Sequence, residues 1–112
     1  IAHDPVLSKN YKCSTARLDM QDCLKALLDA SGVDLCLCGH IHNFQHIRPA
    51  GIKVQYVVNS SGSLARDVKP IDGTLFCSSE AGFSVVSADD DTLTLYMING
   101  KGKIIYSFSI EK

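Results

Sequence analysis

The segment from Val33 to Asn43 constrains the fold of this chain more than any other. It reads Val-Asp-Leu-Cys-Leu-Cys-Gly-His-Ile-His-Asn, a short apolar run that ends at a glycine. Such a run predicts a buried strand, and Gly39 permits a sharp turn where the strand ends. His40 and His42 then follow at positions i and i+2, which project to the same side of an extended segment. Because ligands of α/β sheets bind beyond the carboxyl ends of strands, we predict a metal site here.

A Gly-His-x-His segment alone is also compatible with surface histidines that only form hydrogen bonds to the backbone. A third histidine favours the metal site. His3 follows an apolar and a small residue and precedes Pro5, so it resembles the end of another strand entering a loop. His46 differs in kind, since alternation along a strand places it opposite Gln45 and Ile47. We expect His46 to be an ordinary polar strand residue.

The remaining pattern predicts one main helix and several strands. Ser14 or Thr15 can cap a helix from about residue 16 to residue 30, and Gly32 would end it. Its apolar stripe, expected to pack on a sheet, consists of Leu18, Cys23, Leu24, Leu27 and Leu28. Strands are expected near residues 33–38, 44–48, 53–59, 82–88, 92–98 and 103–110. Residues 60–79 are rich in glycine, serine, proline and charge, so we expect a long loop there.

The last three predicted strands form an antiparallel meander. Asn99-Gly100-Lys101-Gly102 is a strong hairpin signal between two alternating strands. Asp89-Asp90-Asp91 makes the preceding turn. Three consecutive carboxylates outside an EF-hand pattern favour a solvated turn over a calcium site.

These segments together resemble the C-terminal part of calcineurin-like metallophosphoesterases, most closely the small, tartrate-resistant type of purple acid phosphatase. Residues 2–8 are similar to that family's Gly-His-x-Pro segment, with alanine in place of the glycine. Residues 32–43 resemble its Gly-Val-x-x-x-Leu-Cys-Gly-His-x-His-Asn segment, and residues 54–63 resemble the strand and small-residue turn that follow.

The resemblance implies an α/β (α+β) fold, the C-terminal half of a four-layer α/β/β/α sandwich. Here that half would be mostly β, with one main helix and a C-terminal antiparallel meander. We expect residues 1–112 to be the C-terminal portion of a single metallophosphoesterase domain whose N-terminal part is missing. That missing half would be the first partner of this chain.

The resemblance also implies a centre of two metal ions, Fe plus Fe, Zn or Mn. His3 and His40 would ligate the divalent ion, and His42 would ligate the ferric ion. In such a centre a metal-bound hydroxide attacks the phosphorus atom of a phosphate monoester. Lys12 stands where the tartrate-resistant enzymes have a histidine. It is a candidate acid-base or phosphate-binding residue, although a solvated loop cation is the plainer interpretation.

Three further residues are candidates for substrate binding: Asn43, Ser61 and Arg66. Ser61 and Arg66 follow a predicted strand and can approach the same rim as the histidines, where hydroxyl and cationic groups bind phosphate oxygens. The alternative is a surface loop whose serines satisfy turns. The expected substrate is a small-molecule phosphate ester or a phosphoprotein.

Composition argues against several other classes. The formal net charge of −1 over 112 residues gives no electrostatic reason to expect a nucleic acid or an anionic membrane as partner. No apolar stretch approaches the roughly 20 residues that span a bilayer. The 5 cysteines are an odd count without a Cys-x-x-Cys pattern, so most are expected to be small buried hydrophobes. A disulfide between Cys13 and Cys77 stays open, and so does the compartment, although the resemblance suggests a secreted or periplasmic protein.

Three functional classes therefore stay open: a phosphatase for monoesters, a related phosphodiesterase, and a non-catalytic binding module. In the family the other metal ligands come from upstream: two aspartates, a tyrosine, an asparagine and a histidine. Those segments are absent from these 112 residues, so we expect the isolated chain to be inactive.

Overall fold

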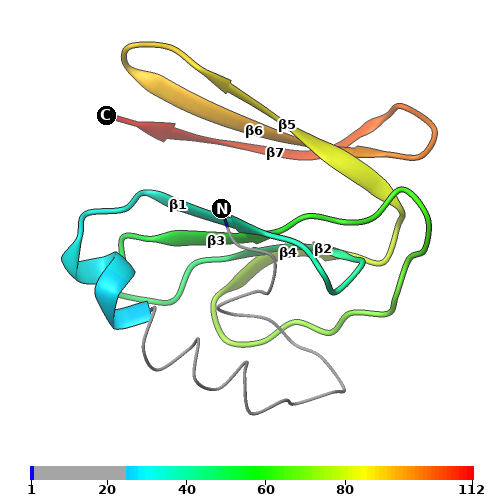
Figure 1. The fold of residues 1–112 in the computed structure, drawn as a ribbon, viewed down its shortest axis with the longest axis horizontal. Helices are drawn as coiled ribbons and strands as arrows, with labels where there is room; N and C mark the ends of the chain where they lie inside the picture. Colours follow the sequence, from blue (N-terminus) through cyan, green and yellow to red (C-terminus); the bar gives the residue numbers. More distant parts are fainter. Residues whose placement is uncertain (2–24) are drawn as a thin grey trace.

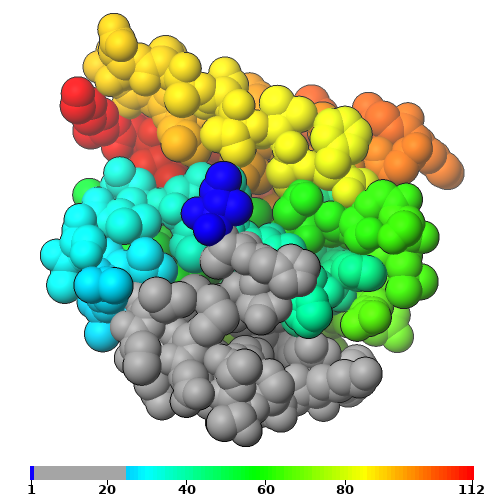
Figure 2. All heavy atoms as spheres, in the orientation of Figure 1, coloured from blue at the N-terminus to red at the C-terminus, as the bar shows by residue number. Residues whose placement is uncertain are grey.

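The computed structural model describes Ile1 and residues 25–112, and in this part of the chain seven strands form two sheets that lie face to face (Figure 1). The four-stranded sheet has the order β1-β3-β2-β4, with β1 at Leu35–Cys38, β2 at Phe44–Ile47, β3 at Gln55–Val58 and β4 at Thr74–Ser78. The three-stranded sheet has the order β5-β6-β7, with β5 at Gly82–Ala88, β6 at Thr92–Asn99 and β7 at Ile104–Glu111. In the space-filling view these last strands, yellow to red, form one layer along the four-stranded sheet (Figure 2).

The topology of the four-stranded sheet brings the ends of three strands together at one edge. Strands β1 and β3 pair in parallel, while β2 pairs antiparallel with β3 and with β4. The carboxyl ends of β1 and β3 therefore meet the amino end of β2. The amide of Asn59, just after β3, donates to the carbonyl oxygen of Cys38 at the end of β1 over 2.7 Å. This bond fixes the start of the loop that carries the two neighbouring histidines.

A helix packs on the face of the four-stranded sheet that points away from the other sheet (Figure 1). Residues 25–30 are helical, and the remainder of the helix expected over residues 16–30 lies outside the described residues. Gly32 ends the helix with a φ of 71°, as the sequence predicted. Leu28 packs against a buried cluster made of Cys36, Ile47, Val54 and Tyr56. Leu27, which we expected in the apolar stripe, is instead 58% exposed.

The facing surfaces of the two sheets form the second core cluster. Its fully buried members are Phe44, Val57, Leu95 and Met97. The alternation along β6 and β7 places apolar side chains on this inner face, and the register between Leu95 and Phe108 aligns two of them directly. The predicted antiparallel meander is thereby confirmed, with bounds that differ by one residue or less.

The prediction that residues 60–79 form only a loop is wrong, because Thr74–Ser78 forms β4. This strand pairs with β2, and Phe76 stacks on Tyr106 of the opposite sheet with ring centroids 4.3 Å apart. The strand has little alternation of its own. Tertiary pairing and the contact with Tyr106 stabilise it, and neither is visible in the local sequence.

The described cysteines behave as small buried side chains. Cys36 and Cys38 are buried, as expected, and Cys36 is a free thiol. Cys77 is also a free thiol, so the disulfide that the sequence left open for it is not formed; Cys13 lies outside the described residues. Among the described residues, no helix has the length and apolar character needed to cross a membrane.

Candidate metal centre

The loop between β1 and β2 holds His40 and His42 in an unusual backbone conformation. Their φ angles are 72° and 65°, and they are the non-glycine residues with positive φ in the described part of the chain. A left-handed conformation costs a residue with a Cβ atom about 1–2 kcal/mol. Residues held in such conformations cluster at functional sites, where the surrounding structure enforces them.

Packing of Ile41, the residue between the two histidines in the sequence, enforces this conformation. Its side chain is buried in a small cluster with Cys38 and Val58, and its amide donates to the carbonyl oxygen of Gly39 over 2.9 Å. The prediction that His40 and His42 share one side of an extended segment is therefore wrong in its geometry. The two residues flank a tight turn instead, hereafter the two-histidine turn, comprising residues 39–42.

The imidazole of His42 carries a buried nitrogen that needs a partner. Its Nδ1 atom is buried and has no hydrogen-bond partner among the described residues. Leaving a buried polar atom unpaired costs about 1–3 kcal/mol, so a ligand at this position is physically favoured. The ring of His40 is exposed at the same turn.

Imidazole nitrogen is a suitable ligand for iron, zinc or manganese, and the unpaired nitrogen of His42 fits a bound metal ion. The two histidines do not complete a site by themselves. Within the described ranges, no group of three or more histidine, cysteine, aspartate or glutamate side chains could hold a metal ion. His3 and Lys12 lie outside the described residues, so their expected roles stay predictions.

The segment of residues 61–67, hereafter the 61–67 segment, lies against the two-histidine turn. The amide of Arg66 donates to the carbonyl oxygen of His42 over 2.8 Å, which brings the exposed Arg66 side chain to the same edge of the sheet. Ser61 is partly exposed, and its Oγ accepts from the amide of Ser63 and lies 2.8 Å from the Ser63 hydroxyl. The hydroxyl of Ser61 thus forms hydrogen bonds within a turn, while the side chain of Arg66 is available to an anion.

Asn43 occupies a position that the sequence did not reveal. Its side chain is fully buried, and its Oδ1 accepts from Gln45 Nε2 over 2.7 Å. Its Nδ2 donates to the carbonyl oxygen of Asp67 over 3.3 Å. This burial separates Asn43 from the exposed candidates for substrate binding. The position of Asn43 directly before β2, all of whose residues are buried, is the one feature that could have indicated its burial.

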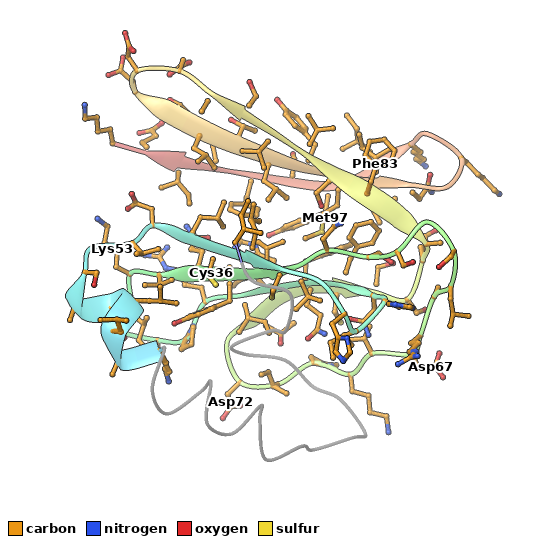
Figure 3. All side chains as sticks on the ribbon, in the orientation of Figure 1. Cys36, Lys53, Asp67, Asp72, Phe83 and Met97 are labelled. Carbon is orange, nitrogen blue, oxygen red and sulfur yellow. The ribbon has the colours of Figure 1, made fainter. Side chains whose placement is uncertain are left out.

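The position of the site within the fold follows from the figures. Asp67 and Lys53 lie at opposite ends of the four-stranded sheet (Figure 3). Since Asp67 binds Asn43 and Lys53 precedes β3, the two-histidine turn lies at the carboxyl ends of β1 and β3. This is the edge where α/β sheets bind ligands.

Comparisons with known families and with curated proteins find no match. Solved structures do match. GAP50, described as the anchor in the inner membrane complex of Plasmodium, is 25% identical with a TM-score of 0.82 over 97% of this chain and 34% of that chain. Purple acid phosphatase PPD1 from yellow lupin (Lupinus luteus) seeds is 23% identical with a TM-score of 0.69 over 79% of this chain and 19% of that chain.

A third similar structure is a conserved uncharacterized protein of Streptococcus pneumoniae, described as a predicted phosphoesterase. It is 15% identical with a TM-score of 0.57 over 95% of this chain and 61% of that chain. The chain therefore spans less than two thirds of each of these proteins. The fold is a mixed α/β fold of the phosphoesterase type, compatible with the C-terminal half of a metallophosphoesterase.

Proposed function

We propose that the protein to which this chain belongs is a metal-dependent phosphoesterase, and that the two-histidine turn supplies part of its metal centre. The observation that carries this proposal is the buried, unpartnered Nδ1 of His42 in a left-handed turn at the carboxyl end of β1. The fold similarity to a purple acid phosphatase and to a predicted phosphoesterase supports it.

His40 and His42 are the described residues that would hold metal, and His3 is the further ligand that we expect from the sequence. A pair of bound metal ions, Fe plus Fe, Zn or Mn, would lower the pKa of water and neutralise charge on the phosphoryl oxygens. Arg66, whose backbone binds the turn, would contribute positive charge to the phosphate group. Lys12 stays a proposed phosphate-binding or acid-base residue.

The proposed substrates are phosphate monoesters, either small molecules or phosphoproteins, with phosphodiesters as the alternative. Hydrolysis of p-nitrophenyl phosphate and of its bis ester tests this choice directly. The full-length protein is freed of metal by a chelator, supplied with iron, manganese or zinc, and assayed on both esters. A metal-dependent rate on the monoester supports the proposal, whereas a faster rate on the bis ester favours the diesterase.

Two variants make the assay specific to the site. His42→Ala is expected to abolish the metal-dependent rate, because it removes the proposed ligand. Ser109→Ala changes an exposed hydroxyl on the three-stranded sheet and is expected to keep the wild-type rate. The isolated 112-residue chain is expected to be inactive for lack of upstream ligands. Activity in that chain would contradict the proposed division of ligands.

A second candidate is a non-catalytic binding role. The similarity to GAP50, whose description names an anchor, covers nearly this whole chain and favours it. This role predicts a full-length protein that hydrolyses neither ester with any of the three metals. Such a result would overturn the phosphoesterase proposal.

A further inference from the structure

We infer that Asn43 is a positioning residue, which holds the two-histidine turn against the 61–67 segment and so keeps His42 oriented for metal. This inference rests on the proposed function. Asn43 directly follows His42 and precedes β2, so it joins the turn to the rigid sheet. Its role is distinct from metal ligation, because its side chain is fully buried and bound to protein groups.

The chemistry of the asparagine side chain matches the two partners it has. Its carbonyl oxygen accepts from Gln45 Nε2, and Gln45 is itself fully buried. Its amide nitrogen donates to the backbone oxygen of Asp67. An amide both accepts and donates, whereas an ionised carboxylate of the same size only accepts. Aspartate at position 43 would therefore place an oxygen against the Asp67 carbonyl.

Two consecutive residues attach the turn to the 61–67 segment. The carbonyl oxygen of His42 accepts from the amide of Arg66 over 2.8 Å, and the side chain of Asn43 binds the next residue, Asp67. These bonds flank the left-handed backbone of His42, which has a φ of 65°. Without them, the His42 backbone can return to an ordinary conformation and the ring changes its direction.

A purely structural role for Asn43 predicts loss of stability without a specific effect on metal binding. Asn99 provides the matched control, because it is a buried asparagine that also binds backbone groups. Its Oδ1 accepts from the amides of Lys101 and Lys103 over 3.1 and 3.0 Å in the hairpin between β6 and β7. Both bonds lie within this hairpin and not at the two-histidine turn, so loss of the Asn99 side chain disturbs a different part of the fold.

The experiment compares full-length wild type, Asn43→Ala, Asn43→Asp and Asn99→Ala in two measurements. The first is the affinity for Mn²⁺ from the electron paramagnetic resonance signal of the free ion. The second is the hydrogen exchange rate of the Arg66 amide in the metal-free protein. Both Asn43 variants are expected to bind Mn²⁺ about 10- to 100-fold more weakly, the usual effect of losing a group that orients a metal ligand. They are also expected to speed exchange at Arg66.

Asn99→Ala is expected to retain wild-type Mn²⁺ affinity and Arg66 exchange. The inference is overturned if Asn43→Ala speeds exchange but binds Mn²⁺ like wild type, or if Asn99→Ala weakens binding equally. If wild type itself binds no Mn²⁺, the proposed function and the orienting role both fail. Asn43→Asp preserves the size of the side chain and the acceptor for Gln45, so it keeps the test open if Asn43→Ala does not fold.

Discussion

The imidazole of His46 stacks on the ring of Phe108 across the two sheets, with ring centroids 3.8 Å apart and planes inclined by 14°. Its Nε2 donates to Gln55 Oε1 over 2.6 Å, and its Nδ1 accepts from the Tyr106 hydroxyl over 2.8 Å. His46 is 1% exposed, and both ring nitrogens are paired. This histidine therefore joins the sheets through packing and hydrogen bonds, whereas His42, which precedes β2, carries an unpaired nitrogen.

Stability should depend on pH through His46. Burial lowers the pKa of this histidine below its ordinary value of 6.5, and the charge of Arg48 adds to the effect, although the bond to Gln55 opposes it. Below pH 6.5 the unfolded chain therefore binds more protons than the folded chain. The stabilising contribution is complete above that pH and is lost as pH falls toward the lowered pKa, by at most about 1.4 kcal/mol per pH unit.

Urea unfolding of wild type and His46→Phe at pH 7.5, 6.5 and 5.5 measures this contribution. The variant keeps an aromatic ring for Phe108 and removes the titrating group. We expect a shallower fall of the unfolding free energy with falling pH in the variant. Identical slopes in the two proteins would contradict the assignment to His46.

Two tyrosines, the buried Tyr56 and the half-buried Tyr106, should respond oppositely to removal of the hydroxyl group. Tyr56 is fully buried, and its hydroxyl has no partner among the described residues. Burial raises the pKa of Tyr56 to about 12, with further contributions from Asp29 and Cys36. Tyr56→Phe removes an unpaired polar group and is expected to raise the unfolding free energy by about 1 kcal/mol.

Tyr106→Phe removes the donor to His46 Nδ1 and leaves that buried nitrogen unpaired. We expect it to lower the unfolding free energy by about 1–2 kcal/mol. Urea denaturation at pH 7.5 compares both variants with wild type. A destabilised Tyr56→Phe together with an unchanged Tyr106→Phe would refute this description of the two hydroxyls.

Glycine is required at position 82, at the start of β5, because the backbone of the neighbouring strand β6 approaches it closely. A Cβ atom at this position would overlap the carbonyl oxygen of Ile98 and contact the Cα of Asn99. Gly82→Ala is expected to lower the unfolding free energy by about 1–3 kcal/mol. Gly100→Ala is the control, because a Cβ atom added at this position would have the carbonyl oxygen of Ala81 as its nearest neighbour, at 3.9 Å. Thermal unfolding of both variants measures the difference, and equal midpoints would argue against the predicted clash.

The sequence predicted those parts of the fold that depend on local pattern. Strand β1 was predicted from its apolar run, and the hairpin at residues 99–102 from its turn residues. The turn is fixed locally, since Asn99 Oδ1 accepts from two amides within it and Gly102 has a φ of 79°. The helix end at Gly32 is equally local. All three features depend on residues that are close together in the sequence.

Features that depend on distant contacts could not be predicted in this way. Strand β4 forms because β2 and Tyr106 lie beside it, and neither is near it in the sequence. His46 was expected to be an ordinary polar strand residue, but every residue of β2 is buried, and the Nδ1 of His46 binds Tyr106, which is 60 residues away. At the candidate centre, the place of His40 and His42 was predicted, but their left-handed backbone depends on the packing of Ile41.

The same holds for Asn43. A polar residue beside a two-histidine motif was interpreted as a substrate-binding group, because its hydrogen-bond partners, the Gln45 side chain and the Asp67 backbone, are not evident from the motif. The 61–67 segment meets the turn only through tertiary structure. The expected ligand His3 lies outside the described residues, so its part in the centre stays a prediction.

Binding of Mn²⁺ to the full-length protein tests the central claim most directly. Wild type, His42→Ala and His46→Phe are titrated at pH 7.5, and free Mn²⁺ is followed by electron paramagnetic resonance. A metal centre at the two-histidine turn predicts that wild type and His46→Phe bind, whereas His42→Ala loses affinity by about 100-fold or more, since removing a ligand costs more than removing its supporting group. Equal affinity of wild type and His42→Ala, or no binding by wild type, would contradict it.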